Sequence, residues 1–311
     1  MYDLIGDIHG HAAELAELLH ALGYEQVNGA YRHPNRRVLF LGDFIDRGPQ
    51  VREALRVVRA MIEQGSALAV LGNHELNAIA FHVADPDAPG HYLRRHTSKH
   101  KGQLHETIAQ LQPDELRSHL DWFRTLPLWL DLDGLRVVHA CWDERELNTV
   151  RSALDEHGGI TDSFLRAAYR PASAVRAAVE TILTGKDAKL PDGMVVHDKD
   201  GGVRSVVSAR WYLPAEGHTY ASYALQTRAI DCERALEPSV IAKASAYAPN
   251  DKPVFVGHYW LSDDCPSILA GNVACLDYSV AKGGFLCAYR WDGEQQLSND
   301  RFVWVKSDGA R

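Results

Sequence analysis

The first eighty residues alternate short apolar runs with amphipathic stretches, and this alternation constrains the fold more than any other feature of the chain. Residues 2–5, 38–41 and 67–71 are short and almost uniformly apolar. Residues 12–22 and 51–62 lie between them and place apolar side chains at helical spacing. Short apolar strands that alternate with helices are typical of a parallel sheet covered by helices on both faces. The sequence therefore predicts an α/β fold in which the strands end in polar, glycine-bearing turns.

The rest of the chain predicts further strands and two long insertions. The expected strands lie at 135–139, 254–256, 273–276, 285–290 and 302–305. The stretch from about 82 to 130 is polar, and we expect it to be helical, since loops beyond about 15 residues are uncommon in compact domains. The stretch 143–213 contains Ala-rich helical segments, with a turn signal at 198–202 near its end. We expect a single domain, 1–311, that carries these two stretches as insertions.

Composition and charge exclude several classes of protein. A formal net charge of −8 argues against a nucleic-acid partner, because such a partner is bound through a basic stripe. The apolar runs fall far short of the roughly 20 residues that span a bilayer. The five cysteines show no CxxC spacing, and the first residues, MYDLIGDIHGH, do not have the basic and apolar regions of a leader. We therefore expect a cytoplasmic protein with reduced thiols and no membrane partner.

Side chains that bind divalent metals follow the expected strands. The six candidates are Asp7 and His9 in GDIHG, Asp43 in GDFIDRG, Asn73 in GNHE, His139 in VVHA and His258 in VGHY. Ligands bind at the carboxyl ends of the strands in open α/β sheets, so these positions can converge although they are far apart in sequence. Imidazole, carboxylate and amide oxygen together suit Mn, Fe, Zn or Ni.

The chemistry of these ligands favours a pair of metal ions. Two cations about 3.5 to 4 Å apart need a bridging carboxylate, and they can hold a hydroxide that attacks phosphorus. We expect Asp43 to be the bridge. Asp7 and His9, two positions apart, can reach one metal together. The other metal would be completed by Asn73, His139 and His258.

The motifs resemble those of a known enzyme family. GDIHG, GDFIDRG and GNHE, followed by an apolar strand that ends in His and by a late GH, resemble the calcineurin-like metallophosphoesterases, in particular the phosphoprotein phosphatase branch. The ending CLDYSVAKGGFLCAYRWDGE is more similar to the bacterial phosphatases that include the dinucleoside tetraphosphatases. The chain departs from the family in two places, since SAPNYC is missing and GHYW replaces GHTP. The resemblance implies a two-sheet αββα sandwich with helical insertions.

The resemblance also implies roles for residues outside the ligand set. His74 would be the general acid, and Asp46 would orient it; a carboxylate partner raises the basicity of an imidazole. Arg47 would hold phosphate oxygens with its planar fork. The family usually has a second phosphate-binding arginine. Arg210 is the first candidate for it in this chain, and Arg204 is the second.

We therefore expect a phosphatase that depends on two divalent metal ions, with Mn first and Fe, Zn or Ni as alternatives. It would hydrolyse phosphomonoesters of a phosphoprotein or a small molecule through attack by metal-bridged hydroxide. The alternative is a bis(5'-nucleosyl)-tetraphosphatase, which hydrolyses a dinucleoside polyphosphate, and a phosphodiesterase is the third option. A non-catalytic metal-binding scaffold is disfavoured, because every expected ligand and the acid are present.

Three features allow two interpretations. GHTY, with His218, matches the family's GHT more literally than the sequence around His258, but no strand precedes it, so His258 is preferred. The histidines and basic residues of 82–119 could steer an anionic substrate or form a solvated helical face. Five aromatic residues could stack on a nucleotide or tyrosyl group or could be buried in the core: Trp142, Trp211, Tyr212, Tyr259 and Trp260.

Overall fold

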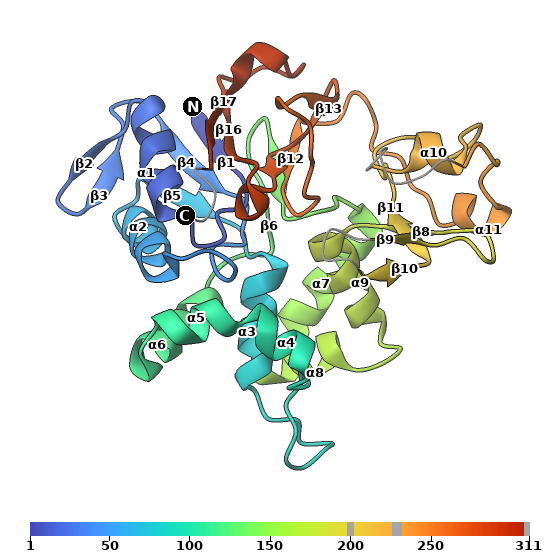
Figure 1. Ribbon diagram of the computed structural model, residues 1–311, viewed down its shortest axis with the longest axis horizontal. Helices are drawn as coiled ribbons and strands as arrows, with labels where there is room; N and C mark the ends of the chain where they lie inside the picture. Colours follow the sequence, from blue (N-terminus) through green and yellow to red (C-terminus); the bar gives the residue numbers. More distant parts are fainter. Residues whose placement is uncertain (198–201, 226–231, 308–311) are drawn as a thin grey trace.

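The first of two central sheets contains all three strands expected near the start of the chain (Figure 1). The computed structural model describes residues 1–197, 202–225 and 232–307. The strands of this sheet are β1 Tyr2–Ile5, β4 Arg37–Phe40, β5 Ala67–Ala69, β15 Asp277–Tyr278, β16 Phe285–Trp291 and β17 Phe302–Lys306. Their order is β15, β16, β1, β4, β5, with β17 paired to β16. β1, β4 and β5 run parallel, as expected, whereas β16 is antiparallel to β1.

The second sheet packs against the first, and its strands lie between residues 129 and 275. Its strands are β6 Trp129–Asp131, β7 Arg136–Val138, β12 Val254–Val256, β13 Ile268–Ala270 and β14 Val273–Cys275. Their order is β13, β14, β12, β7, β6. Phe255 of β12 contacts Tyr289 of β16 with ring centroids 5.1 Å apart, and both side chains are fully buried. The main core therefore lies between the two sheets.

Helices cover the outer faces of both sheets. On the first sheet these are α1 Ala12–Ala21 and α2 Val51–Glu63, and α1 buries Leu15, Leu18 and Leu19. On the second sheet they are α7 Glu144–His157, α8 Asp162–Tyr169 and α9 Ala174–Thr184. Arg151 of α7 lies 5.4 Å from the ring of Trp129 on β6. This arrangement confirms the predicted two-sheet αββα sandwich.

The first predicted insertion is helical. It follows α3 Asn73–His82 and contains α4 Ser98–Gln103, α5 His105–Gln110 and α6 Pro113–Phe123. α5 packs against α2, and α6 packs against α3. A small hairpin outside the insertions is formed by β2 Glu25–Val27 and β3 Ala30–Arg32, and short 3-10 helices cover Val280–Lys282 and Asn299–Arg301. In the described residues, no helix combines the length and the apolar character needed to cross a membrane.

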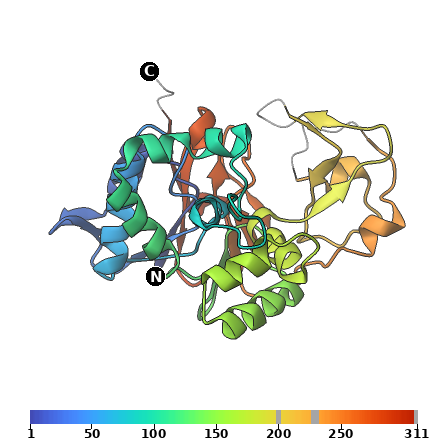
Figure 2. The ribbon, with the colours of Figure 1, turned by 90° about the horizontal axis from the view of Figure 1, so that it is seen from below.

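The second insertion leads into a separate lobe, which we call the distal lobe (Figures 1 and 2). It consists of β8 Asp187–Lys189, β9 Val196–His197, β10 Val203–Arg204, β11 Val206–Ser208, α10 Tyr220–Tyr223 and α11 Pro238–Ile241. Leu190, Tyr220, Tyr223 and Leu236 belong to a core of its own. The single-domain organisation stays a prediction. The turn expected at 198–202 lies, apart from Gly202, outside the described residues.

Candidate active site

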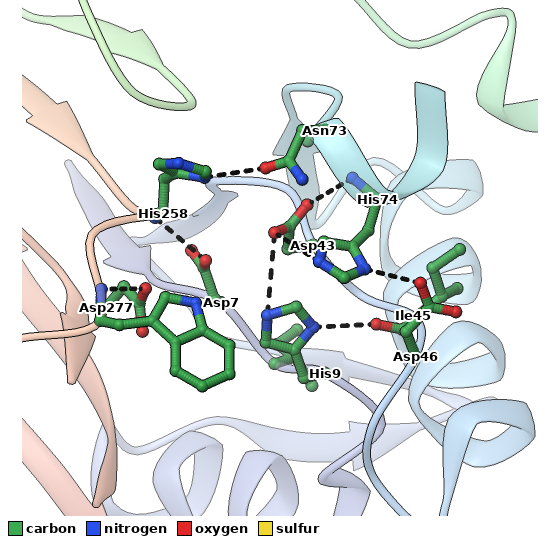
Figure 3. A network of polar contacts seen from close by, with 12 residues as sticks. Asp7, His9, Asp43, Ile45, Asp46, Asn73, His74, His258 and Asp277 are labelled. Carbon is green, nitrogen blue, oxygen red and sulfur yellow. Dashed lines mark hydrogen bonds and ion pairs between the residues drawn. The ribbon is translucent and has the colours of Figure 1, made fainter. Parts of the chain in front are cut away.

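The structure brings all six predicted metal ligands together at the carboxyl ends of the strands. Figure 3 labels five of them, all except His139. They are Asp7 and His9 after β1, Asp43 after β4, Asn73 at the start of α3, His139 after β7 and His258 after β12. Ligand atoms lie within 4.8 Å of one another in two groups, and Asp43 belongs to both. One group adds His9 and His74, and the other adds His139 and His258. The shared residue is the one expected to bridge two metals.

The carboxylate of Asp43 lies at the centre of the cluster. Its Oδ2 is 3.3 Å from Nε2 of His139 and 3.7 Å from Nε2 of His9. Its Oδ1 accepts a hydrogen bond of 3.0 Å from the backbone N–H of His74. The backbone bond fixes the orientation of the carboxylate, and Oδ2 is left facing the imidazoles.

Two buried ligand atoms beside Asp43 have no hydrogen-bond partner among the described residues. Nδ1 of His9 donates to the carbonyl of Ile45 at 2.9 Å, so Nε2 carries the lone pair, and this atom is one of the two. The other atom is Oδ1 of Asp7. The second oxygen of this carboxylate, Oδ2, accepts a hydrogen bond of 3.0 Å from the backbone N–H of His258. A Cβ at Gly257 would lie 2.0 Å from that Oδ1, so only glycine leaves the atom its space. Burying two such atoms without partners is costly, and a cation would satisfy both.

The second half of the cluster is organised around the amide of Asn73. Its Oδ1 lies 3.0 Å from Nε2 of His139 and 2.8 Å from Nδ1 of His258. Nδ1 of His139 donates to the carbonyl of Leu41 at 2.7 Å, so its Nε2 faces Asp43 and Asn73. An imidazole held in this way by a backbone carbonyl is the usual arrangement of a metal-binding histidine.

The electrostatics of the cluster also suit cations. Burial, and next the carboxylate of Asp277, raise the pKa of Asp7 well above its usual value. Burial alone would lower the pKa of His139, but Asp43 and Asp7 outweigh burial and raise it to about 10. Burial lowers the pKa of His258 to about 3, which keeps that imidazole neutral. The carboxylates of Asp43 and Asp7 are close enough to His139 to favour its protonated form. The electrostatic potential in this region is therefore negative.

His74 and Asp46 form a buried pair next to the ligands. Nδ1 of His74 donates to Oδ2 of Asp46 at 2.6 Å. Burial opposes protonation of His74, but Asp43 and Asp46 together raise its pKa above the usual value. Thr107, from the first insertion, is fully buried and holds Asp46 twice: its hydroxyl donates to Oδ1 at 2.5 Å and accepts from the N–H at 3.0 Å. Sequence reasoning missed Thr107.

Arg47 lies at the site against an aromatic ring. Its guanidinium carbon is 4.0 Å from the centroid of Trp260, and the same ring lies 5.8 Å from the ring of His9. The backbone N–H of Trp260 donates to Oδ2 of Asp277 at 2.6 Å. Trp260 therefore acts on Arg47 rather than belonging to the core. The other four aromatic residues weighed from the sequence are buried, as the structural interpretation expects: Trp142, Trp211, Tyr212 and Tyr259.

The remaining candidates lie in or near the distal lobe. Nε of Arg210 donates to the carbonyl of Ala224 at 3.1 Å. Arg204 acts electrostatically on His258 and forms an ion pair of 3.3 Å with Asp187. A second phosphate-binding arginine therefore stays a prediction, with Arg210 and Arg204 as its candidates.

The rival histidine also lies away from the cluster. Nδ1 of His218 is 3.0 Å from the hydroxyl of Ser222, near the start of α10. In the His-rich stretch, the ring of His96 stacks between Phe81 at 3.8 Å and Tyr92 at 4.0 Å. His258 is therefore the histidine that completes the ligand cluster, and His96 has a structural contact.

A pocket of about 910 Å³ adjoins the ligand cluster. Asn73 and Asn77 of α3 line one side, Thr184 of α9 and Tyr223 of α10 line others, and Lys243 follows α11. Its volume lies within the range of about 300 to 1,000 Å³ that is usual for small-molecule sites. The pocket is therefore formed by the sandwich, the insertions and the distal lobe together.

The family can be assigned at this point. The model of the family described as Calcineurin-like phosphoesterase matches residues 2–214, which is more than half of the chain. The chain belongs to the calcineurin-like phosphoesterase family. This confirms the resemblance predicted from the motifs and makes the chain a phosphoric ester hydrolase that uses divalent metal ions.

Two curated relatives of this phosphoesterase carry similar names. A bis(5'-nucleosyl)-tetraphosphatase, asymmetrical, from Oceanobacillus iheyensis is 32% identical over 139 residues, which cover 44% of this chain and 54% of the relative. The chain thus matches about half the length of that relative. A bis(5'-nucleosyl)-tetraphosphatase, symmetrical, from Proteus mirabilis is 26% identical over 303 residues, or 94% of each chain.

A solved structure shows the same fold at low identity. The cold-active protein-tyrosine phosphatase of a psychrophilic Shewanella species aligns with 99% of this chain and 78% of its own, with a TM-score of 0.51 and 16% identity. This similarity supports the architecture alone.

Glu75, the last residue of GNHE, is a second residue that the sequence argument left without a role. It is fully buried, and its Oε2 accepts from the N–H groups of Asp43 at 2.9 Å and Gly72 at 3.1 Å. Its Oε1 accepts from the N–H groups of Phe44 at 2.8 Å and Ile45 at 3.3 Å. Burial, with Asp43 next, raises the pKa of Glu75 to about 7. The sequence feature that could have indicated a role for Glu75 is its position in GNHE, directly after Asn73 and His74.

The loops of the site have unusual backbone geometry. Six non-glycine residues of the site adopt left-handed φ values: His9 at 43°, Asp43 at 52°, Asp46 at 69°, Arg47 at 70°, His258 at 69° and Trp260 at 54°. Such conformations cost free energy and persist only where surrounding contacts impose them. Three of the four hydrogen bonds of Glu75 are such contacts for the loop after β4.

We predict that Glu75→Gln destabilises the protein by about 2 to 4 kcal/mol, because the new amide group faces buried N–H donors instead of accepting from them. Urea unfolding of the metal-free protein measures this. Glu63→Gln, at an exposed position on α2, is the matched control and should change the free energy of unfolding by less than about 0.5 kcal/mol. Equal stability of the two variants would contradict the role of Glu75.

Proposed function

We propose that the chain is a dinuclear metallophosphoesterase that hydrolyses dinucleoside polyphosphates. The observation that carries the proposal is the two-sided ligand cluster on Asp43, next to a pocket much larger than a single phosphate needs. The names of the two curated relatives support this substrate class. The sequence alone placed phosphomonoesters first; the pocket and the relatives move the dinucleoside polyphosphate ahead of them.

The metal ions would be held on both sides of Asp43. One site would use Asp7, His9 and Asp43, where the two unpartnered atoms lie, and the other would use Asp43, Asn73, His139 and His258. Two bound cations would activate water and neutralise charge on the phosphoryl oxygens. The mixture of nitrogen and oxygen ligands suits Mn first, with Fe, Zn or Ni as alternatives.

The chain's own residues would bind the phosphate and move a proton. Arg47, stacked on Trp260, would hold phosphate oxygens with its planar fork. Nε2 of His74 would protonate the leaving oxygen, while Asp46 holds Nδ1 and keeps the ring oriented. Thr107 would keep Asp46 in place through its two hydrogen bonds.

The substrate class can be tested by comparing initial rates with Mn²⁺ on diadenosine tetraphosphate, p-nitrophenyl phosphate and a phosphopeptide. We predict that kcat/KM is highest for diadenosine tetraphosphate, since only that substrate fills both the metal site and the pocket. A higher kcat/KM on the phosphopeptide or on p-nitrophenyl phosphate would replace the proposed substrate by a phosphomonoester.

The proposed acid can be tested with His74→Asn. We predict a loss of kcat on the order of 10² to 10⁴, because Asn cannot deliver the proton. Metal content, measured by mass spectrometry of the loaded protein, should stay at the wild-type value, since His74 is not in the proposed ligand set. Wild-type turnover in this variant would refute the role of His74.

The bridge can be tested with Asp43→Asn. We predict that both metal positions weaken together, because an amide removes the charge that two cations would share. Calorimetric titration of the metal-free protein with Mn²⁺ measures the two sites. Loss of a single site, with the other at wild-type affinity, would show that Asp43 is not shared.

A further inference from the structure

The pocket beside Asn73 combines an apolar wall with a charged one. Leu76, Leu93, Val179 and Leu183 supply apolar surface. The basic residues that line it are Arg94, Arg95, Arg145, Arg176, Lys186 and Lys243. Its carboxylates are Glu146, Glu180 and Asp187. Although the chain has a net charge of −8, the lining of this pocket holds more basic groups than carboxylates, which favours an anionic ligand.

Several of these basic groups already have acidic partners. Lys186 pairs with Asp143 at 2.5 Å, and Arg176 pairs with Glu180 at 2.8 Å on the same helix. Arg145 is paired with the neighbouring Glu146. The charges of these three are therefore largely compensated within the protein.

Arg94 differs from them, because its hydrogen-bond partners are neutral. One terminal nitrogen donates to Oδ1 of Asn77 at 2.5 Å, and the other donates to Oε1 of Gln103 at 2.7 Å. Asn77 also accepts from the hydroxyl of Tyr169 at 2.7 Å. Among the described residues, no carboxylate forms an ion pair with Arg94. Its guanidinium is thus held in one orientation without an ion pair among the described residues, and the carboxylate of Asp46 acts on it only through longer-range electrostatics.

The position of Arg94 links the pocket to the reaction site. Arg94 lines the large pocket together with Asn73, and it also lines a small cavity with Asp46 and His74. A fixed guanidinium is well suited to phosphate oxygens, and it has five N–H donors, of which two are used here. A ligand phosphate could take some of the others.

We propose that this pocket binds the nucleotide part of the substrate that lies beyond the scissile phosphate, and that Arg94 binds its phosphate oxygens. The inference rests on the proposed function, since it places one half of a dinucleoside polyphosphate. The apolar wall would take the nucleoside, and the basic wall would take the phosphate chain.

ATP is the probe for a test that does not depend on turnover. Calorimetric titration of the metal-free protein with ATP should show binding, and Arg94→Gln should weaken the affinity about tenfold, because a charge-assisted hydrogen bond is lost. Arg94→Lys keeps the positive charge and loses the planar guanidinium. Its affinity for ATP should therefore lie between those of the wild type and Arg94→Gln. The matched control is Arg117→Gln, a highly exposed charge on α6, which should bind ATP like the wild type.

With metal-loaded enzyme, the ratio of kcat/KM on diadenosine tetraphosphate to that on p-nitrophenyl phosphate should fall about tenfold in Arg94→Gln. This ratio cancels an effect on the chemical step that both substrates share. Wild-type affinity for ATP in Arg94→Gln, or no ATP binding by the wild-type protein, would overturn the inference. The inference would also be overturned if Arg94→Gln weakened the binding of a phosphopeptide and left the binding of ATP unchanged. If the wild type cleaves only p-nitrophenyl phosphate, the proposed function fails, and the ATP titration still decides what the pocket binds.

Discussion

The rest of the site depends on the carboxylate of Glu75. Its two oxygens accept four backbone N–H groups, three from the loop after β4 and one from the residue before α3. That loop carries Asp43, Asp46 and Arg47 in left-handed conformations, which an unsupported chain would leave. One buried acid thereby places the proposed bridging ligand, the partner of the proposed general acid and the arginine proposed to bind phosphate. Neither sheet does this directly, because the strands end before the loop begins.

Much of this arrangement could be predicted from the sequence, because it follows from strand direction. Parallel strands bring their carboxyl ends to one edge of each sheet, and the packing of the two sheets places these edges side by side. Asp7 after β1 and His258 after β12 therefore meet across 251 positions without any local signal that links them. Thr107 could not be predicted in this way. It is a single threonine in a polar segment, and only the packing of α5 against α2 brings it to Asp46. The distal lobe was missed for a related reason, since its strands are two or three residues long and show no clear periodicity.

The histidine content and the net charge of the chain are explained in different ways. His9, His74, His139 and His258 lie in the site, whereas His96 is stacked between Phe81 of α3 and Tyr92 of the first insertion. The acidic charge of the chain is partly a property of the ligand cluster, where cations would offset it. The lining of the large pocket, by contrast, holds more basic groups than carboxylates. An anionic substrate would therefore meet positive charge on both sides, from the metals and from the pocket wall.

One helix joins these two regions. α3 begins at Asn73, whose amide oxygen lies between two metal-site histidines, and it places Asn77 one turn later, where the amide oxygen accepts from Arg94. Residues four apart lie on the same face of a helix, so the spacing between the metal site and the arginine is set by the helical rise of about 6 Å. His74 and Glu75 lie within the same first turn. A shift of α3 would therefore disturb the metals, the proton donor and the pocket together, and the first insertion, which packs α6 on this helix, opposes such a shift.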